Sequence, residues 1–243
     1  MLMGSVSSAC ALSVKQVAHD QKTVYMVTGG HTDPVTGSQC HWTTFRICTT
    51  TYMLAAGLAE TLYKKFGGKW YFITPDYAFG HTRQAAYSKL LKGLGGTELG
   101  NSLAPLGSTD YTSYLIKAQQ AKPDVLVLLV DGQDLVNCMK QATQFGLTKK
   151  FAIGGGLGEI EVLRALPKEA QLGWWTLEWD WDQPNTPHVK EWVASYQKVY
   201  TDGSYPSART WCGYAGLHSL GRGLAKAQSL ESDGVAKDFA GQV

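Results

Sequence analysis

Short apolar runs alternate with stretches of helical periodicity along most of this 243-residue chain. The clearest run is Val125 to Val130, where every side chain is apolar, as expected for a strand buried on both faces of a sheet. Trp70 to Thr74 is a second such run, and Pro75 and Asp76 end it before Gly80 opens a helical period. A strand that passes through a short loop into a helix predicts a ligand-binding crevice at the end of the strand.

The alternation predicts an α/β fold, with parallel sheets flanked by helices on both faces. We expect strands at residues 24–27, 70–74, 98–103, 125–130, 151–153 and 173–177, with a short extended piece near Phe45. We expect helices at residues 8–19, 52–66, 80–94, 111–121, 133–145, 159–165, 187–200 and 207–227. Because no strand separates the last two helices, the chain is expected to return there to an earlier sheet.

Charge and hydropathy exclude several classes of partner. The formal net charge is only +2 and no run of Lys or Arg exceeds two residues, so the basic patch of a nucleic-acid-binding protein is absent. No apolar stretch approaches the roughly 18 residues that a membrane span needs, so direct membrane insertion is not expected. Met1 to Ser8 lacks the basic and apolar segments of a secretory signal. A small-molecule or protein partner is therefore favoured.

The five cysteines form no Cys-x-x-Cys pair and lie among apolar neighbours or in expected helices. Small buried hydrophobic side chains are their simplest interpretation, and we expect no metal site. Cys40 and Cys48 flank an expected strand, and their spacing leaves a disulfide between them open.

Several short motifs, in one order along nearly the whole chain, together resemble a known family. They are Ser7-Ser8 at a helix start, the loop Thr28 to Pro34, the turn Asp76 to Gly80, Asp110-Tyr111, Lys140 to Ala142 with Phe145 to Leu147, and Tyr205-Pro206 before Trp211 and Tyr214. The chain resembles type I periplasmic solute-binding proteins of ABC importers. The most similar branch, which includes the Leu/Ile/Val-binding proteins, binds branched-chain amino acids, amides and aromatic acids.

The resemblance implies two Rossmann-like lobes that close about a hinge on a ligand held between them. Residues 1–47 and 181–243 would form lobe one, and residues 48–180 would form lobe two. Compared with the family, the chain begins after the opening strands of lobe one and stops before the last return into lobe two. We therefore expect a partial lobe one, whose sheet has an exposed edge.

The resemblance also implies which residues of lobe one hold the carboxylate of a ligand. Ser8 and the stretch Gly30, His31 and Thr32 match the family's carboxylate-binding positions. Free N–H groups at a helix start and a serine hydroxyl favour an anion on physical grounds as well. The alternative is that Ser7 or Ser8 only caps the helix.

Three positions of lobe two and one arginine complete the expected site. Phe79 matches an aromatic residue that stacks on the ligand, Asp131 follows the central strand, and Gly155 falls near a position where amino-acid binders have an acid. Losing that acid weakens the case for an α-amino acid unless Asp131 or another acid takes its place, because a buried ammonium group needs a carboxylate partner. Arg209, where an aromatic is expected, either grips a second carboxylate or is a solvated surface residue. A carboxylate-bearing compound is therefore expected first, and a branched-chain amino acid second.

We thus expect the substrate-binding component of an ABC transporter, with a membrane permease as partner and a periplasmic or secreted location. The resemblance implies no enzymatic activity and no cofactor. Two alternatives stay open: a ligand-sensing receptor domain of the same fold, and a nucleotide-dependent flavodoxin-like or Rossmann-like enzyme. The glycine run Gly154 to Gly158 supports the enzyme weakly, because it lacks the Gly-x-Gly-x-x-Gly spacing. The tryptophans from Trp174 to Trp181 are expected to have a packing or hinge role.

Overall fold

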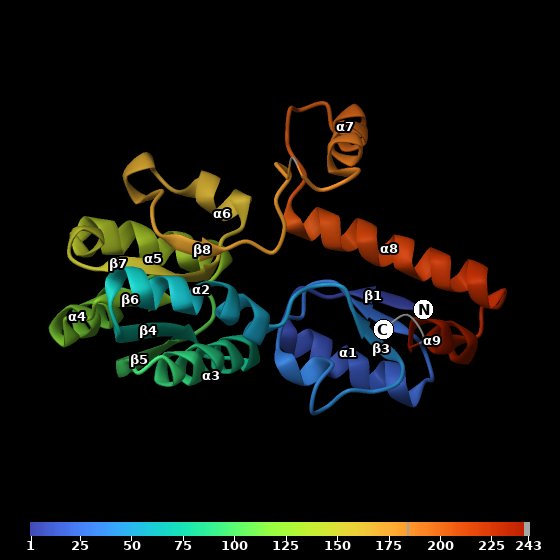
Figure 1. Ribbon diagram of the computed structural model, residues 1–243, viewed down its shortest axis with the longest axis horizontal. Coiled ribbons are helices and arrows are strands. Elements are labelled where there is room, and N and C mark those ends of the chain that lie inside the picture. The colour runs from blue at the N-terminus through green and yellow to red at the C-terminus, as the bar shows by residue number, and fades with distance from the viewer. Residues whose placement is uncertain (184, 241–243) are drawn as a thin grey trace. The chain divides into compact units, whose positions relative to one another are not determined.

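The computed structural model describes residues 1–183 and 185–240 (Figure 1). The chain divides into two compact units, and unit 1 comprises Met1–Thr49 and Glu178–Val243. Unit 2 comprises Thr50–Leu177. The chain thus crosses between units at 49/50 and 177/178, whereas the predicted lobe boundaries lie at 47/48 and 180/181. Within the described ranges, no helix has the length and apolar character that a membrane span requires.

Unit 2 is a five-stranded parallel sheet in the order β5-β4-β6-β7-β8. Its strands are β4 (Lys69–Pro75), β5 (Thr97–Ala104), β6 (Val125–Leu128), β7 (Ala152–Leu157) and β8 (Trp174–Thr176). Its α-helices are α2 (Thr51–Phe66), α3 (Ala78–Gly93), α4 (Thr112–Ala121), α5 (Gly132–Gln144) and α6 (Ile160–Ala165), with 3-10 turns η2 (Leu147–Lys149) and η3 (Lys168–Ala170). This is the α/β architecture that the alternation of strands and helices predicts.

The central strand β6 explains why the run Val125 to Val130 is apolar throughout. Val125 and Val127 pack with α2 and α3 on one face, whereas Leu126 and Leu128 pack with α4 and α5 on the other. Since side chains alternate between the faces of a strand, a strand covered on both sides needs apolar residues at every position.

Unit 1 contains a three-stranded parallel sheet in the order β1-β2-β3. Its strands are β1 (Leu2–Gly4), β2 (Tyr25–Val27) and β3 (Thr44–Arg46). Its helices are α1 (Ser8–Asp20), α7 (Val189–Val199), α8 (Ala208–Ala227) and α9 (Ser232–Ala240), with the 3-10 turn η1 (Asp33–Val35). Tyr25 and Val27 pack with α1, and Met26 packs with α8 and α9. The sheet has fewer strands than that of unit 2, and Leu2 and Met3 on β1 are exposed.

The glycine run after β6 differs from its expected structure. The sequence predicts a strand only over residues 151–153, but β7 continues through the glycines to Leu157. A Cβ atom at Gly156 would lie 2.7 Å from Cζ3 of Trp175, and one at Gly158 would lie 2.6 Å from Cβ of Trp175. Gly156 therefore leaves room for the ring of Trp175, and Gly158 leaves room for its Cβ, which removes the support that the glycine run gave to a nucleotide-binding loop.

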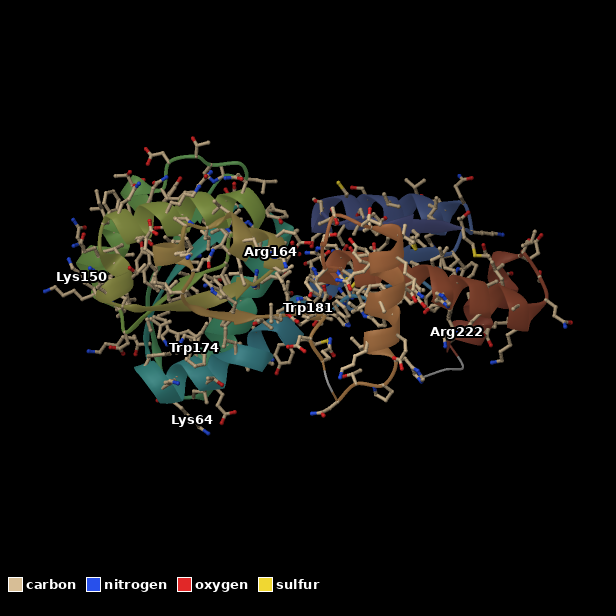
Figure 2. All side chains as sticks on the ribbon, turned by 90° about the horizontal axis from the view of Figure 1, so that it is seen from above. Lys64, Lys150, Arg164, Trp174, Trp181 and Arg222 are labelled. Atoms are coloured by element: carbon tan, nitrogen blue, oxygen red, sulfur yellow. The ribbon has the colours of Figure 1, made fainter. Side chains whose placement is uncertain are left out.

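The tryptophans that follow have packing roles within their own units. Trp175 packs against the core on the α4 and α5 side of unit 2. Trp174 lies near α2, with the ring of Phe66 at 5.7 Å and Nζ of Lys65 at 4.2 Å from its ring (Figure 2). In unit 1, Trp179 stacks on Trp211 at 5.4 Å.

Candidate ligand-binding site

Ser8 and the loop after β2 lie together in unit 1. The N-cap of α1 is Ser7, whose side chain accepts a hydrogen bond from the backbone N–H of Cys10. Ser8 is therefore not the cap, and its Oγ accepts a hydrogen bond of 3.2 Å from the backbone N–H of Thr32. Gly30 sits close against α1, since a Cβ there would lie 2.5 Å from Cβ of Ala11. The backbone of this loop thus approaches the helix start more closely than a larger residue would allow.

The loop is oriented by Arg46, a residue that the sequence analysis missed. Nη1 of Arg46 donates to the carbonyl oxygens of Gly30, His31 and Thr32, at 3.3, 3.2 and 2.8 Å. In a planar trans peptide the carbonyl and the next N–H point in opposite directions. The N–H groups of residues 31 and 32 therefore point away from Arg46, and that of Thr32 reaches Ser8. Arg46 is half-buried, and the loss of solvent around its guanidinium lowers its pKa.

His31 connects this loop to α8 and to the end of the first chain segment of unit 1. Its Nδ1 lies 2.8 Å from the carbonyl oxygen of Thr49, and its Nε2 lies 2.8 Å from Nη1 of Arg209. A guanidinium can only donate, so Nε2 accepts and the proton resides on Nδ1, which donates to Thr49. The ring is therefore neutral in this arrangement.

Arg209, in the first turn of α8, is partly buried rather than solvated, with 24% of its side chain exposed. Beside its contact with His31, its Nη1 lies 3.8 Å from Oε2 of Glu178. The structure therefore contradicts the interpretation of Arg209 as a solvated surface residue. It brings Arg209 to the same part of unit 1 as the carboxylate-binding positions, and we call the set Ser8, Gly30, His31, Thr32 and Arg209 the anion cradle.

Glu178 is the second residue that the sequence analysis missed in unit 1. Its side chain is only 4% exposed, and its Oε1 accepts hydrogen bonds from N–H and Oγ1 of Thr49, at 2.5 and 3.0 Å. Its Oε2 is buried and lies 3.8 Å from Nε2 of His31. A carboxylate thus contributes a negative charge directly beside the anion cradle.

One group of potential metal ligands occurs among the described residues: His31, Cys48 and Glu178, whose ligand atoms lie within 4.8 Å of one another. Burial, reinforced by the charge of Glu178, raises the pKa of Cys48 to about 12, so its thiol stays protonated at neutral pH. Arg209 already donates to the imidazole nitrogen that a metal would need. These observations favour a hydrogen-bonded cluster. Cys40 is exposed and Cys48 is buried, and both are free thiols.

The three candidate residues of unit 2 are also brought together, by Arg83, which the sequence analysis missed. Arg83 is fully buried, with Nη1 at 3.0 Å from Oδ2 of Asp131 and Nη2 at 2.8 Å from the carbonyl oxygen of Gly155. Its guanidinium carbon lies 5.0 Å from the ring centroid of Phe79. Asp131 also accepts a hydrogen bond from the N–H of Leu157 at 3.1 Å. One arginine on α3 therefore organises all three positions.

The surroundings of Phe79 and Gly155 limit what these residues can do. Phe79 is 4% exposed and packs with Leu54 and Leu157. Gly155 has a φ of +96°, and a Cβ there would lie 2.4 Å from Cγ1 of Val127. An acidic side chain at position 155 is therefore incompatible with this backbone.

The comparisons agree with the family that the motifs indicate. The family model described as periplasmic binding protein matches residues 1–241, so the chain belongs to the periplasmic binding protein family. Its structural neighbours have the type I fold of ABC-transporter binding proteins. No curated protein matches the chain.

Three solved structures illustrate the similarity. A periplasmic binding protein from Burkholderia mallei is 32% identical, with a TM-score of 0.89 over 97% of this chain and 62% of its own. An amino acid ABC transporter substrate-binding protein from Pseudomonas fluorescens is 27% identical, with a TM-score of 0.85 over 98% of this chain and 63% of its own. An ABC transporter solute-binding protein from Rhodopseudomonas palustris, in complex with 3,4-dihydroxybenzoic acid, is 24% identical, with a TM-score of 0.84 over 96% of this chain and 64% of its own. The chain therefore spans less than two thirds of the length of these relatives.

Proposed function

We propose that this chain is the substrate-binding part of an ABC importer and that its anion cradle holds the carboxylate of a small solute. The observation that carries the proposal is the convergence of the Ser8 hydroxyl, the start of α1 and the Arg209 guanidinium on one loop. Each of these groups favours a negative charge. The loop itself is held by its carbonyls, which directs its N–H groups to the side of Ser8.

An acid without an amino group is the preferred ligand class. Asp131 is paired with the buried Arg83, so the charges of this pair cancel. Position 155 does not accept an acidic side chain. A ligand ammonium group would therefore compete with Arg83 for its carboxylate. The 3,4-dihydroxybenzoic acid bound by the relative from Rhodopseudomonas palustris belongs to this ligand class.

The remaining parts of the proposal follow from family membership. Phe79, Asp131 and Gly155 are proposed to contact the rest of the ligand. A membrane permease is the proposed protein partner, and the periplasm is the proposed location. Solute capture requires no turnover, so we propose no enzymatic activity for the chain.

The experiment is a calorimetric titration of the 243-residue chain with 3,4-dihydroxybenzoate, L-leucine and the neutral analogue catechol. We expect 3,4-dihydroxybenzoate to bind more tightly than either of the other two. Arg209→Gln should weaken its binding at least tenfold, as expected for the loss of a charge-assisted hydrogen bond of roughly 1.5–3 kcal/mol. Phe79→Ala should weaken it by a similar factor, because an aromatic contact is lost.

Arg222→Gln is the matched control, because Arg222 lies on the same helix as Arg209 but is exposed (Figure 2). Its affinity should equal that of the wild type. If catechol binds as tightly as the acid, or if both arginine variants behave alike, a carboxylate is not what the cradle recognises.

A further inference from the structure

Glu178 occupies an unusual position, because it joins the two places where the chain leaves and re-enters unit 1. Thr49 is the last residue before the chain enters unit 2, and Glu178 is the first residue after its return. The carboxylate accepts both the N–H and the hydroxyl of Thr49 through one oxygen, Oε1. The second oxygen, Oε2, therefore has a fixed position.

That second oxygen lies beside the anion cradle, beyond hydrogen-bonding distance of Arg209 and His31. Oε2 lies 3.8 Å from both Nη1 of Arg209 and Nε2 of His31, and it is buried. A buried carboxylate beside a guanidinium usually forms a shorter, bidentate contact. Here Thr49 holds Oε1, while Nη1 of Arg209 donates to the neutral ring of His31 at 2.8 Å. Arg209 is thus close enough to Glu178 to be partly neutralised by it, through an ion pair of 3.8 Å.

We propose that Glu178 is a positioning residue that sets the strength of the anion cradle: anchored by Thr49, it is held where its charge partly neutralises Arg209. This inference rests on the proposed function of the cradle. Glu178 does not contact the ligand in this proposal. It moderates the affinity for an acid, and the chain releases its ligand more readily than a bare arginine would allow.

Two arginines and two cysteines lie near the carboxylate of Glu178. Burial lowers the pKa of Arg46 and the charge of Glu178 acts to raise it, whereas burial followed by the charge of Glu178 raises the pKa of Cys48 and of Cys212 to about 12. Both thiols are therefore neutral neighbours at physiological pH.

The proposal predicts opposite effects for two conservative substitutions. Glu178→Gln keeps an oxygen for the Thr49 N–H but removes the negative charge, so 3,4-dihydroxybenzoate should bind about tenfold more tightly, as estimated for a charge several ångströms away at a partly buried site. Thr49→Val removes one of the two donors that hold Oε1, which frees Glu178 to approach Arg209. Binding should then weaken about threefold, in line with the loss of one hydrogen bond.

Structural damage cannot imitate this pair of results, because it would weaken binding in both variants. Glu191→Gln is the charge-matched control, an exposed position on α7 of unit 1, and it should bind like the wild type. If Glu178→Gln weakens binding, or if both variants change affinity in the same direction, the proposal is wrong.

A second measurement needs no ligand and so separates this inference from the proposed function. Urea unfolding of the wild type, Glu178→Gln, Arg209→Gln and the double variant forms a double-mutant cycle. We expect the change in unfolding midpoint of the double variant to differ from the sum of the two single changes, because Glu178 and Arg209 form an ion pair. Additive midpoints would overturn the inference even if the wild type binds 3,4-dihydroxybenzoate. Coupled midpoints in a chain that binds no acid would support the Glu178–Arg209 interaction and reject the proposed function instead.

Discussion

The buried pair of Arg83 and Asp131 should dominate the stability of unit 2. Arg83 is fully buried, and its charge is balanced by Asp131 at 3.0 Å, whose side chain is 24% exposed. Removing one member of a buried ion pair typically costs about 3–5 kcal/mol, because the other charge is left in a site of low polarity. Asp131→Ala would also remove the acceptor for the N–H of Leu157. We therefore expect the variant to lose about 4 kcal/mol of unfolding free energy.

Further variants separate the charge from the contacts. Asp131→Asn keeps an acceptor for the N–H of Leu157 but removes the negative charge. It should therefore lose about half as much unfolding free energy as Asp131→Ala. Arg83→Met combined with Asp131→Ala removes both charges, and replacing a buried pair by apolar groups is often close to neutral. We expect the double variant to recover to within about 1–2 kcal/mol of the wild type. Glu161→Ala, at an exposed position on α6, should change the stability little.

Urea unfolding measures these differences, with hydrogen exchange at the amides of β6 assigning the transition to unit 2. With a slope of about 2 kcal/mol/M, a loss of 4 kcal/mol would lower the midpoint by about 2 M. If Asp131→Ala loses less than about 1 kcal/mol, or if the double variant is no more stable than the single one, Arg83 is not a buried charge that depends on Asp131.

Two other predictions concern unit 2. Gly156→Ala should destabilise the chain by about 1–3 kcal/mol, because its Cβ would lie 2.7 Å from the ring of Trp175. Gly213→Ala is the control, because a Cβ at this position on α8 meets no atom within 4 Å. In the same urea assay it should be neutral or stabilising by up to about 1 kcal/mol. If the two variants have equal midpoints, crowding by Trp175 is not what requires glycine. Desolvation raises the pKa of Asp134 above its ordinary value, so the folded state favours the protonated carboxyl. The stability that the protonated carboxyl contributes is complete below the pKa of Asp134 in the unfolded chain, and it is lost as the pH rises through the pKa in the folded chain. Asp134→Asn, which keeps an acceptor for the N–H of Gly107, should therefore be more stable than the wild type at pH 7 by up to about 1 kcal/mol and equal to it near pH 3. An advantage that stays constant between pH 3 and pH 7 would contradict the role of ionisation.

The sheet of unit 2 could be predicted because its strands are buried on both faces and separated by periodic helices. The same reasoning missed β1, which has three residues that are mostly exposed and therefore carries no apolar pattern. It also missed α9, which begins with Ser232, Asp233 and Gly234, residues typical of turns. The length of β7 was underestimated because glycine favours loops, and the close packing of Gly154, Gly155 and Gly156 against Trp174, Val127 and Trp175 explains why glycines form a strand there.

The candidate site was predictable in part, because resemblance identifies positions and not their partners. The motifs pointed to Ser8 and to the loop of residues 30–32, whereas Arg46, Arg83 and Glu178 were missed. Arg83 had a detectable signal, since it is a charged residue four positions after Phe79 on the face of a helix that must pack against the sheet. Glu178 had none, because its partners Thr49 and Arg209 lie far from it in sequence.

The sequence separation of these charges also explains why the single residues gave ambiguous interpretations. Arg209 alone fits either a solvated surface cation or a grip for a second carboxylate of the ligand. Nη1 of Arg209 lies 3.8 Å from Oε2 of Glu178 and 2.8 Å from Nε2 of His31, so its guanidinium already interacts with two groups of unit 1. These contacts favour a ligand with one carboxylate over a ligand with two. A second anionic group of the ligand would have to displace Glu178, which Thr49 holds in place. Under the proposed function, we therefore expect the chain to bind a monocarboxylate more tightly than a dicarboxylate.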